Sequence, residues 1–265
     1  MADMPDDLAI PECMKSTVEQ YSQTSVADGA SGATVCRLKA RGKRTLYLKC
    51  GAGKVADDIT AEMVRLQWLA GRVPIPAIHQ FVCIPQQAFL LTTAVPGMSA
   101  YDWMRLYPER RPGTVAALGH FLRMFHSLPV TECPFNSTHE RRFVDARNNV
   151  ESGQVDESDF DSDHNGWSAE QVWAQMLGLL PMNFDRVVTH GDFSLGNILI
   201  ENGAVTGCVD VGRAGVADPY QDLAILSQNL GEFGGDLQMQ LFRAYGIAEP
   251  DIRKMSFHRC LDEFF

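Results

Sequence analysis

The first hundred residues alternate between short apolar runs and turn-forming residues, a pattern typical of antiparallel strands. Between the third and fourth of these runs, apolar side chains recur at helical spacing, which predicts a helix over residues 58–70. Asp57 or Asp58 can cap this helix, and Gly71 ends it. The front of the chain therefore predicts one helix and five strands, over residues 17–24, 34–40, 45–49, 81–84 and 89–93.

The pattern becomes mainly helical after Gly97. Two short strands, over residues 197–200 and 205–209, are joined by a hairpin signal at 201–203. We predict an α+β fold of two lobes, a small antiparallel β-rich lobe over residues 1–96 and a larger, mainly α-helical lobe over 97–265. The helices expected in the second lobe begin at Pro112 and span residues 140–150, 169–180, 220–230, 236–245 and 250–263.

Charge differs sharply between the two halves of the chain. The formal net charge is −10, yet residues 1–150 hold 14 acidic and 17 basic side chains, against 19 and 6 in residues 151–265. Such an acidic balance disfavours nucleic acid and anionic membranes as partners. The seven cysteines form no C-x-x-C pair, and the N-terminus has no signal-peptide pattern, so we expect neither a zinc site nor secretion, and a cytoplasmic location.

One segment carries a spacing typical of phosphoryl transfer. His190, Asp192 and Asn197 form an H-x-D-x-x-x-x-N run, and after the predicted hairpin Asp210 and Gly212 form D-x-G. Phosphoryl transfer needs a carboxylate that orients the attacking hydroxyl, a role that falls to Asp192. It also needs hard oxygen ligands for Mg²⁺, for which Asn197 and Asp210 are the candidates.

The front lobe offers matching groups for a nucleotide. Lys49 ends the third predicted strand, where it could reach phosphates, and Glu62 in the following helix could pair with it. Taken alone, each is better explained as a solvated surface charge. A glycine-containing turn at residues 28–32 could present backbone N–H groups to phosphate.

From this turn to its last residue, the chain resembles the aminoglycoside 3′-phosphotransferases (kanamycin kinases), which share the protein-kinase-like fold. Residues 188–197, 207–218 and 261–265 carry the resemblance. It implies ATP and Mg²⁺ as cofactors, with Asp192 as the catalytic aspartate and Asn197 and Asp210 as metal ligands. It also implies nucleotide contacts through Lys49 with its partner Glu62, through Ser31, and through the backbone of Thr93 and Val95.

The same resemblance implies a site for a small polycationic drug in the acidic half of the chain. Charge-assisted hydrogen bonds from several carboxylates would hold the drug's ammonium groups. Ser162 and Asn229 stand where some relatives have carboxylates, so the drug preference of those relatives does not carry over. The implied drug-binding groups are Asp159, Asp161, Arg213, Glu232, Asp262, Glu263 and the terminal carboxylate of Phe265.

Two other functions compete with phosphorylation of the 3′-hydroxyl of kanamycin or neomycin. A kinase of the same fold could act on another small amine or sugar, such as choline, but a single cation would not need the acidic loop at residues 156–163. An inactive binding module is disfavoured because Lys49, Asp192, Asn197 and Asp210 are all present. We therefore expect an enzyme that confers aminoglycoside resistance.

Overall fold

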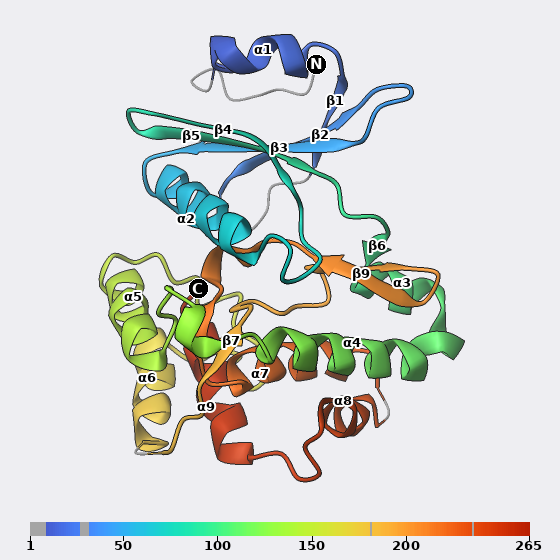
Figure 1. The fold of residues 1–265 in the computed structure, drawn as a ribbon. Helices are drawn as coiled ribbons and strands as arrows, with labels where there is room; N and C mark the ends of the chain where they lie inside the picture. Colours follow the sequence, from blue (N-terminus) through green and yellow to red (C-terminus); the bar gives the residue numbers. More distant parts are fainter. Residues whose placement is uncertain (1–8, 27–31, 181, 235) are drawn as a thin grey trace. The chain divides into compact units, whose positions relative to one another are not determined.

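The computed structural model describes residues 9–26, 32–180, 182–234 and 236–265 (Figure 1). It divides into two compact units, which we describe separately. The first runs to Gly97 and includes Thr206–Gly212, and the second comprises Met98–Val205 and Arg213–Phe265. This division differs from the predicted boundary after residue 96 in two respects, because Gly97 and residues 206–212 belong with the first unit.

The first unit contains the predicted five-stranded antiparallel sheet, with strand order β1-β2-β3-β5-β4. Its register places Lys49 opposite Leu90 and Leu46 opposite Thr93. The α+β fold class is thereby confirmed. The strands are β1 (Ser22–Val26), β2 (Thr34–Lys39), β3 (Leu46–Ala52), β4 (Ile78–Ile84) and β5 (Gln87–Thr93).

The prediction of a single helix in this unit is wrong, because α1 (Glu12–Val18) precedes the sheet. Thr17 and Val18 are helical and not part of the first strand, since Met14 and Val18 lie one turn apart and are both buried. The second helix, α2 (Lys54–Leu69), begins four residues before the predicted start. Gly53 precedes it with a φ of 59°, a conformation that suits glycine.

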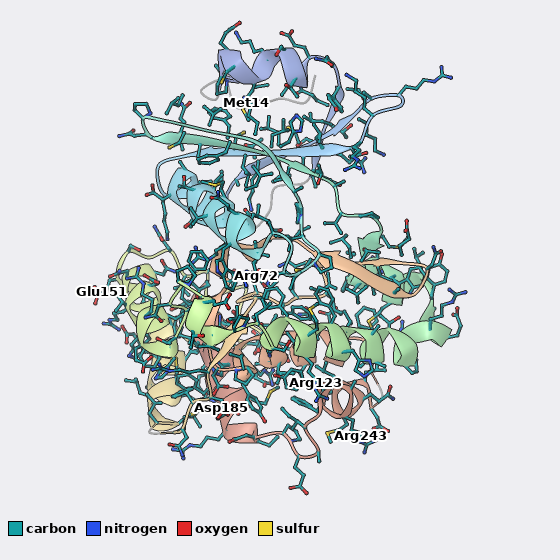
Figure 2. All side chains as sticks on the ribbon, viewed as in Figure 1. Met14, Arg72, Arg123, Glu151, Asp185 and Arg243 are labelled. Carbon is teal, nitrogen blue, oxygen red and sulfur yellow. The ribbon has the colours of Figure 1, made fainter. Side chains whose placement is uncertain are left out.

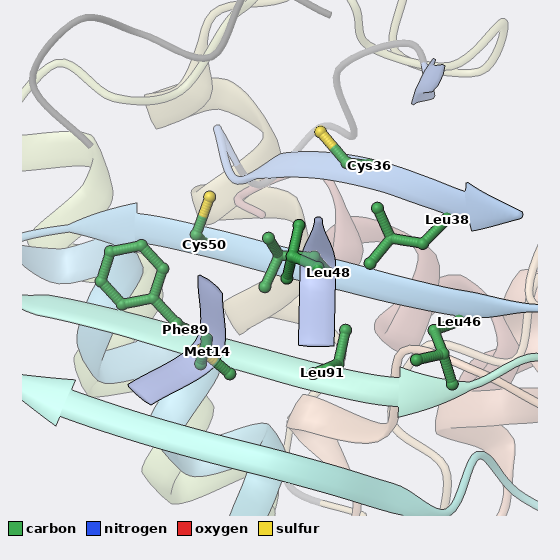
Figure 3. Close-up of a cluster of buried hydrophobic side chains, with 9 residues drawn as sticks. Met14, Cys36, Leu38, Leu46, Leu48, Cys50, Phe89 and Leu91 are labelled. Atoms are coloured by element: carbon green, nitrogen blue, oxygen red, sulfur yellow. The ribbon is translucent and has the colours of Figure 1, made fainter. Parts of the chain in front are cut away.

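A buried cluster joins α1 to the sheet (Figure 3). Met14 of α1 and Phe89 of β5 are fully buried in it, beside Cys36 and Cys50. Burial raises the pKa of the Cys50 thiol to about 11, because the apolar surroundings disfavour the thiolate. These two cysteines therefore act as small apolar side chains, as expected for thiols within apolar runs.

The second unit is a helical assembly in which α4 packs against α8, and α9 packs against α6 and α7. Arg123 and Arg243, labelled in Figure 2, mark the last turns of α4 and α8. All six predicted helices are present, within a few residues of their expected ends. The helices are α3 (Ala100–Leu106), α4 (Arg111–His126), α5 (His139–Glu151), α6 (Ala169–Gly178), α7 (Tyr220–Gly231), α8 (Leu237–Tyr245) and α9 (Ile252–Asp262).

Short elements complete the chain, and several of them were not predicted. Ser99 caps the unpredicted helix α3 by accepting a hydrogen bond from the Asp102 N–H at 3.0 Å. The predicted hairpin is confirmed as β8 and β9. The remaining elements are β6 (Met98–Ser99), β7 (Val187–Thr189), β8 (Ile198–Glu201), β9 (Ala204–Cys208), β10 (Gly215–Ala217) and the short 3-10 turns at Pro108–Arg110, Val130–Glu132 and Val211–Arg213.

A reciprocal hydrogen-bond pair starts α6. The Ser168 hydroxyl accepts from the Gln171 N–H, and the Gln171 side chain accepts from the Ser168 N–H at 2.8 Å. We expect Ser168→Ala to lower the free energy of unfolding by about 1 kcal/mol, because one N–H of the first helical turn loses its partner. Urea denaturation of both proteins measures this difference, and an unchanged midpoint would contradict the role of the cap.

No helix among the described residues is long and apolar enough to cross a membrane.

Candidate functional site

The H-x-D-x-x-x-x-N segment forms a compact loop between β7 and β8. Asn197 Nδ2 donates one hydrogen bond to Asp192 Oδ2 and another to the Asp192 carbonyl oxygen, both at 3.0 Å. The two predicted residues are therefore held side by side, five positions apart in the sequence. Because the amide nitrogen is used in this way, Asn197 Oδ1 is the atom left to meet a cation.

A buried carboxylate on α7 anchors this loop. Asp222 is fully buried, and it accepts hydrogen bonds from the N–H groups of His190 at 2.7 Å and Gly191 at 2.8 Å. His126 Nε2 lies 2.9 Å from Asp222 Oδ2, and His126 Nδ1 lies 2.8 Å from the Tyr245 hydroxyl. Asp222 thus fixes the backbone two residues before Asp192.

Gly191 stands between His190 and Asp192, where the H-R-D motif of protein kinases has arginine. Its φ is 89°, and a Cβ atom at this position would lie 2.4 Å from the carbonyl oxygen of Arg213. Backbone conformation and close packing therefore both require glycine here.

In the first unit, Lys49 contacts two carboxylates, its predicted partner Glu62 and the predicted metal ligand Asp210. Its Nζ lies 2.8 Å from Glu62 Oε2 on α2 and 2.8 Å from Asp210 Oδ1 after β9. Burial opposes the ammonium charge, but the two carboxylates outweigh it and raise the pKa of Lys49 above its ordinary value. Lys49 is therefore a fixed positive charge, and the interpretation of Lys49 and Glu62 as unrelated surface charges is wrong.

The other predicted nucleotide contacts are less defined. Ser31 lies outside the described residues. The Thr93 N–H donates to the Ala77 carbonyl at 2.9 Å, so a nucleotide contact of Thr93 would use its carbonyl oxygen. Val95 is half-buried. The contacts of all three with a nucleotide stay predictions.

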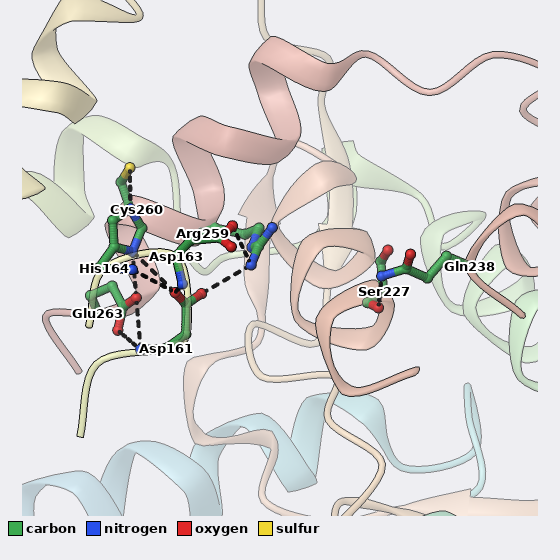
Figure 4. Close-up of polar contacts among 8 residues, drawn as sticks. All are labelled: Asp161, Asp163, His164, Ser227, Gln238, Arg259, Cys260 and Glu263. Atoms are coloured by element: carbon green, nitrogen blue, oxygen red, sulfur yellow. Dashed lines mark hydrogen bonds and ion pairs between the residues drawn. The ribbon is translucent and has the colours of Figure 1, made fainter. Parts of the chain in front are cut away.

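Two of the predicted drug-binding carboxylates form one cluster in the second unit. The Asp161 N–H donates to both oxygens of Glu263, at 3.2 and 3.3 Å. His164 Nδ1 lies 2.6 Å from Glu263 Oε1 and 3.3 Å from Asp161 Oδ1 (Figure 4). Burial raises the pKa of Glu263 to about 7, against the opposing effect of the His164 hydrogen bond.

Three further drug-binding candidates gather around a buried arginine on α5. Arg142 Nη2 lies 3.4 Å from Asp262 Oδ1, and its guanidinium lies 4.4 Å from the centre of the Phe265 ring. Arg213 Nη2 donates to the main-chain oxygen of Phe265 at 3.2 Å. Burial, and next the Asp192 carboxylate, raise the pKa of Asp262, while Arg142 and Arg213 act in the opposite direction.

The structure does not join Asp159 and Glu232 to these clusters. Both side chains are exposed, and within the described ranges neither forms a side-chain hydrogen bond or ion pair. Ser162 is also exposed. Asn229 has a structural contact instead, because its Oδ1 accepts from the Leu195 N–H at 2.9 Å and supports the Asp192 loop.

The sequence reasoning missed three residues, Arg142, His164 and Asp222. Arg142 shares one face of α5 with buried Ala146, one turn later, so an arginine within an apolar stripe was a usable signal. His164 lies in an acidic loop, and a histidine among acidic residues is expected to pair with a carboxylate. Asp222 had no local signal, because its partners lie 31 and 32 positions earlier.

Each predicted metal ligand, taken by itself, offers an oxygen atom of the type that suits a divalent cation. Asp210 is half exposed, and its φ of 57° is a left-handed conformation that aspartate tolerates better than most residues. Asn197 contributes an amide oxygen. Carboxylate and amide oxygens are the ligands that Mg²⁺ prefers.

Comparison with known proteins supports this interpretation of the residues. Residues 22–258 match the family model described as "Phosphotransferase enzyme family". An aminoglycoside 3′-phosphotransferase of Escherichia coli is 52% identical over 238 residues, which cover 89% of this chain and 88% of that protein. Among solved structures, an aminoglycoside 3′-phosphotransferase of type VIII is similar with a TM-score of 0.86 and 34% identity, covering 96% of this chain and 97% of the other.

An aminoglycoside phosphotransferase from Streptomyces rimosus, solved in complex with ADP and streptomycin, is similar with a TM-score of 0.78 and 26% identity, over 95% of each chain.

Proposed function

Because this chain belongs to the aminoglycoside 3′-phosphotransferase family, we propose that it transfers the γ-phosphoryl group of ATP to the 3′-hydroxyl of aminoglycosides such as kanamycin and neomycin and so confers resistance to them. The observation that carries this proposal is the Asp192–Asn197 pair, held by two 3.0 Å hydrogen bonds in a loop that Asp222 anchors. The choline-kinase-like alternative is not favoured, since the similar proteins carry aminoglycoside names.

In the proposed reaction, Asp192 accepts the proton of the attacking hydroxyl and orients its oxygen. A bond forms between this oxygen and the γ-phosphorus, the bond from the γ-phosphorus to the β–γ bridging oxygen breaks, and ADP leaves. The transition state is loose, so positioning and charge stabilisation supply most of the rate. Asn197 orients Asp192, because its Nδ2 binds Asp192 Oδ2 and leaves the other carboxylate oxygen for the hydroxyl.

Lys49 would neutralise charge on the nucleotide phosphates. Its ion pairs with Glu62 and Asp210 hold the ammonium in place before the nucleotide arrives. We propose Asn197 and Asp210 as the residues that hold Mg²⁺, which when bound neutralises charge on the phosphate oxygens. The need for ATP favours a cytoplasmic location.

An assay of ATP turnover with kanamycin, with choline and with neither tests the proposed function. We expect ADP release only with kanamycin, and phosphorus NMR of the product is expected to show a monoester at the 3′-oxygen. Turnover with choline alone would replace the proposal by its alternative, and the absence of turnover with any acceptor would overturn it.

The salt dependence of drug affinity is a second test, of whether carboxylates bind the drug. Kanamycin affinity is expected to fall at least tenfold between about 0.05 and 0.5 M NaCl, because ions screen a polycation from partly exposed carboxylates over roughly 10 Å at 0.1 M. ATP affinity at saturating Mg²⁺ is expected to change less. Calorimetric titrations at several salt concentrations measure both, and salt-independent kanamycin binding would argue against a carboxylate site.

A further inference from the structure

His164 is almost completely buried, yet its imidazole faces several ionisable side chains. The loop that carries it supplies Asp161 and Asp163, and α9 with its C-terminal cap supplies the rest (Figure 4). The ring also lies edge-on to Trp167, with centroids 5.6 Å apart. The groups around it from α9 are Arg259, Cys260 and Glu263.

The two ring nitrogens of His164 have different surroundings. Nδ1 faces the carboxylates, 2.6 Å from Glu263 Oε1 and 3.3 Å from Asp161 Oδ1. Nε2 faces the Cys260 sulfur at 3.6 Å. When Glu263 is ionised, it can only accept, so the ring donates to it from Nδ1. Burial raises the pKa of the Cys260 thiol to about 12, so a neutral thiol lies beside Nε2.

These contacts fasten the acidic loop to the end of α9. Arg259 Nη2 adds ion pairs to Asp161 Oδ2 at 3.2 Å and to Asp163 Oδ2 at 2.7 Å. The three ligand atoms of Asp161, His164 and Glu263 lie within 4.8 Å of one another, but 2.6 Å is a hydrogen-bond length, so a proton and not a cation joins His164 to Glu263.

Only about a tenth of each carboxylate side chain is exposed, 10% for Asp161 and 9% for Glu263. The orientation of each carboxylate, and so the small part of it that a ligand can reach, is therefore determined by the side chains that contact its buried side. Among those groups, His164 alone contacts both carboxylates through one atom. Loss of this contact would leave the Glu263 carboxylate held, among the described residues, by the Asp161 N–H alone.

We propose that His164 is a positioning residue of the aminoglycoside site, whose Nδ1–H holds the Glu263 and Asp161 carboxylates together, charged and aimed at the drug's ammonium groups. This inference rests on the proposed function. It assigns His164 no contact with the phosphoryl group, so its effect belongs to drug binding and not to the chemical step.

The hydrogen bond also gives drug binding a defined pH dependence. Burial raises the pKa of Glu263 to about 7, and the His164 bond works against that rise by favouring the carboxylate. As pH rises through 7, the cluster loses a proton and gains one negative charge, so drug affinity increases. Without His164, Glu263 remains protonated to higher pH, and the increase in drug affinity occurs at higher pH.

The test compares His164→Leu, which has no donor, with His164→Asn, whose amide N–H takes the place of Nδ1–H. His120→Leu is the matched control, since His120 is exposed on α4 in the same unit. KM for kanamycin, KM for ATP and kcat are measured from pH 6 to 9, with thermal melts of each protein. The drug's own titration is common to all variants and cancels in the comparison.

For His164→Leu we expect KM for kanamycin to rise about tenfold at pH 7, as for loss of one charge-assisted hydrogen bond. Its KM–pH profile is expected to shift upward by about one pH unit, with kcat and KM for ATP within threefold of the parent. His164→Asn is expected to recover most of the affinity. Profiles that superimpose on the parent, or an equal loss in kcat and in both KM values, would overturn the inference.

If His164→Leu does not fold, His164→Asn and a Glu263→Gln variant carry the test. Glu263→Gln is expected to remove the contribution of Glu263 to the KM–pH profile near pH 7 and to leave only that of the drug. A Glu263→Gln profile with the same pH dependence as the parent would overturn the inference. A parent protein that does not phosphorylate kanamycin refutes the proposed function, whereas an active parent with unaffected variants refutes only the role of His164.

Discussion

Asp192→Asn is expected to lower kcat by roughly 10²- to 10⁴-fold, with ATP affinity within a few-fold of the parent, because the carboxylate acts on the hydroxyl during transfer. The substitution keeps the size of the side chain and replaces one carboxylate oxygen by a donor nitrogen. That nitrogen cannot accept the substrate proton. The 3.0 Å contact with Asn197 Nδ2 can survive through the remaining amide oxygen. Single-turnover kinetics with saturating ATP separate this effect from binding.

Glu201→Gln is the matched control for the Asp192 prediction. Glu201 is exposed at the end of β8, the strand that follows the Asp192 loop, and the substitution removes the same charge. We expect its kcat to stay within twofold. An Asp192→Asn protein with kcat within threefold of the parent would remove Asp192 from the catalytic role.

Much of the fold could be predicted from the sequence because most elements carry a local signal. The five strands of the first unit are short apolar runs between turns, and they pair antiparallel as expected. The errors occur where the signal is weak or misleading. In α1, Thr17 and Val18 favour a strand by type, but packing of Met14 and Val18 against the sheet outweighs that preference.

For the site, sequence reasoning performed well where a motif has fixed spacing and poorly where partners are distant. Asp192 and Asn197, five positions apart, were both predicted as site residues, and the structure brings them into contact. The His164–Glu263 contact spans 99 positions and was not predicted, and neither was the burial of the Asp161 and Glu263 carboxylates. Their burial comes from the packing of α9, which no local pattern reports.

The C-terminal residues illustrate the same point. Phe264 is buried in a cluster with α5, α6 and α9, and its ring lies 5.5 Å from that of Trp173. Phe265 is more exposed and lies beside Arg142 and Arg213. Removing both residues would therefore damage the apolar cluster together with the proposed drug site. Phe265→Ala separates the two effects, because it leaves Phe264 in place in the apolar cluster.

Asp222→Ala is expected to give the largest loss of stability. Asp222 is fully buried and accepts from two backbone N–H groups, His190 and Gly191, while it contacts His126 Nε2. Truncation leaves all three polar groups without this acceptor in an apolar interior. Removing one partner of a buried charged network lowers the free energy of unfolding by about 3–5 kcal/mol. In a protein larger than 150 residues this corresponds to a fall in Tm of roughly 6–20 °C.

Asp222→Asn tests whether Asp222 anchors the Asp192 loop or only fills space. The amide retains one acceptor oxygen, but it brings a donor toward the N–H groups of His190 and Gly191. We expect a smaller loss of stability than for alanine, with a kcat reduced at least tenfold at a temperature where the protein stays folded, since the backbone before Asp192 is displaced. Asp236→Asn, at an exposed position before α8 whose side chain caps no N–H, is the control and is expected to change neither value. Calorimetric melts and kanamycin turnover at 20 °C measure both quantities. A folded Asp222→Asn protein with parental kcat would show that the Asp192 loop keeps its geometry without this anchor.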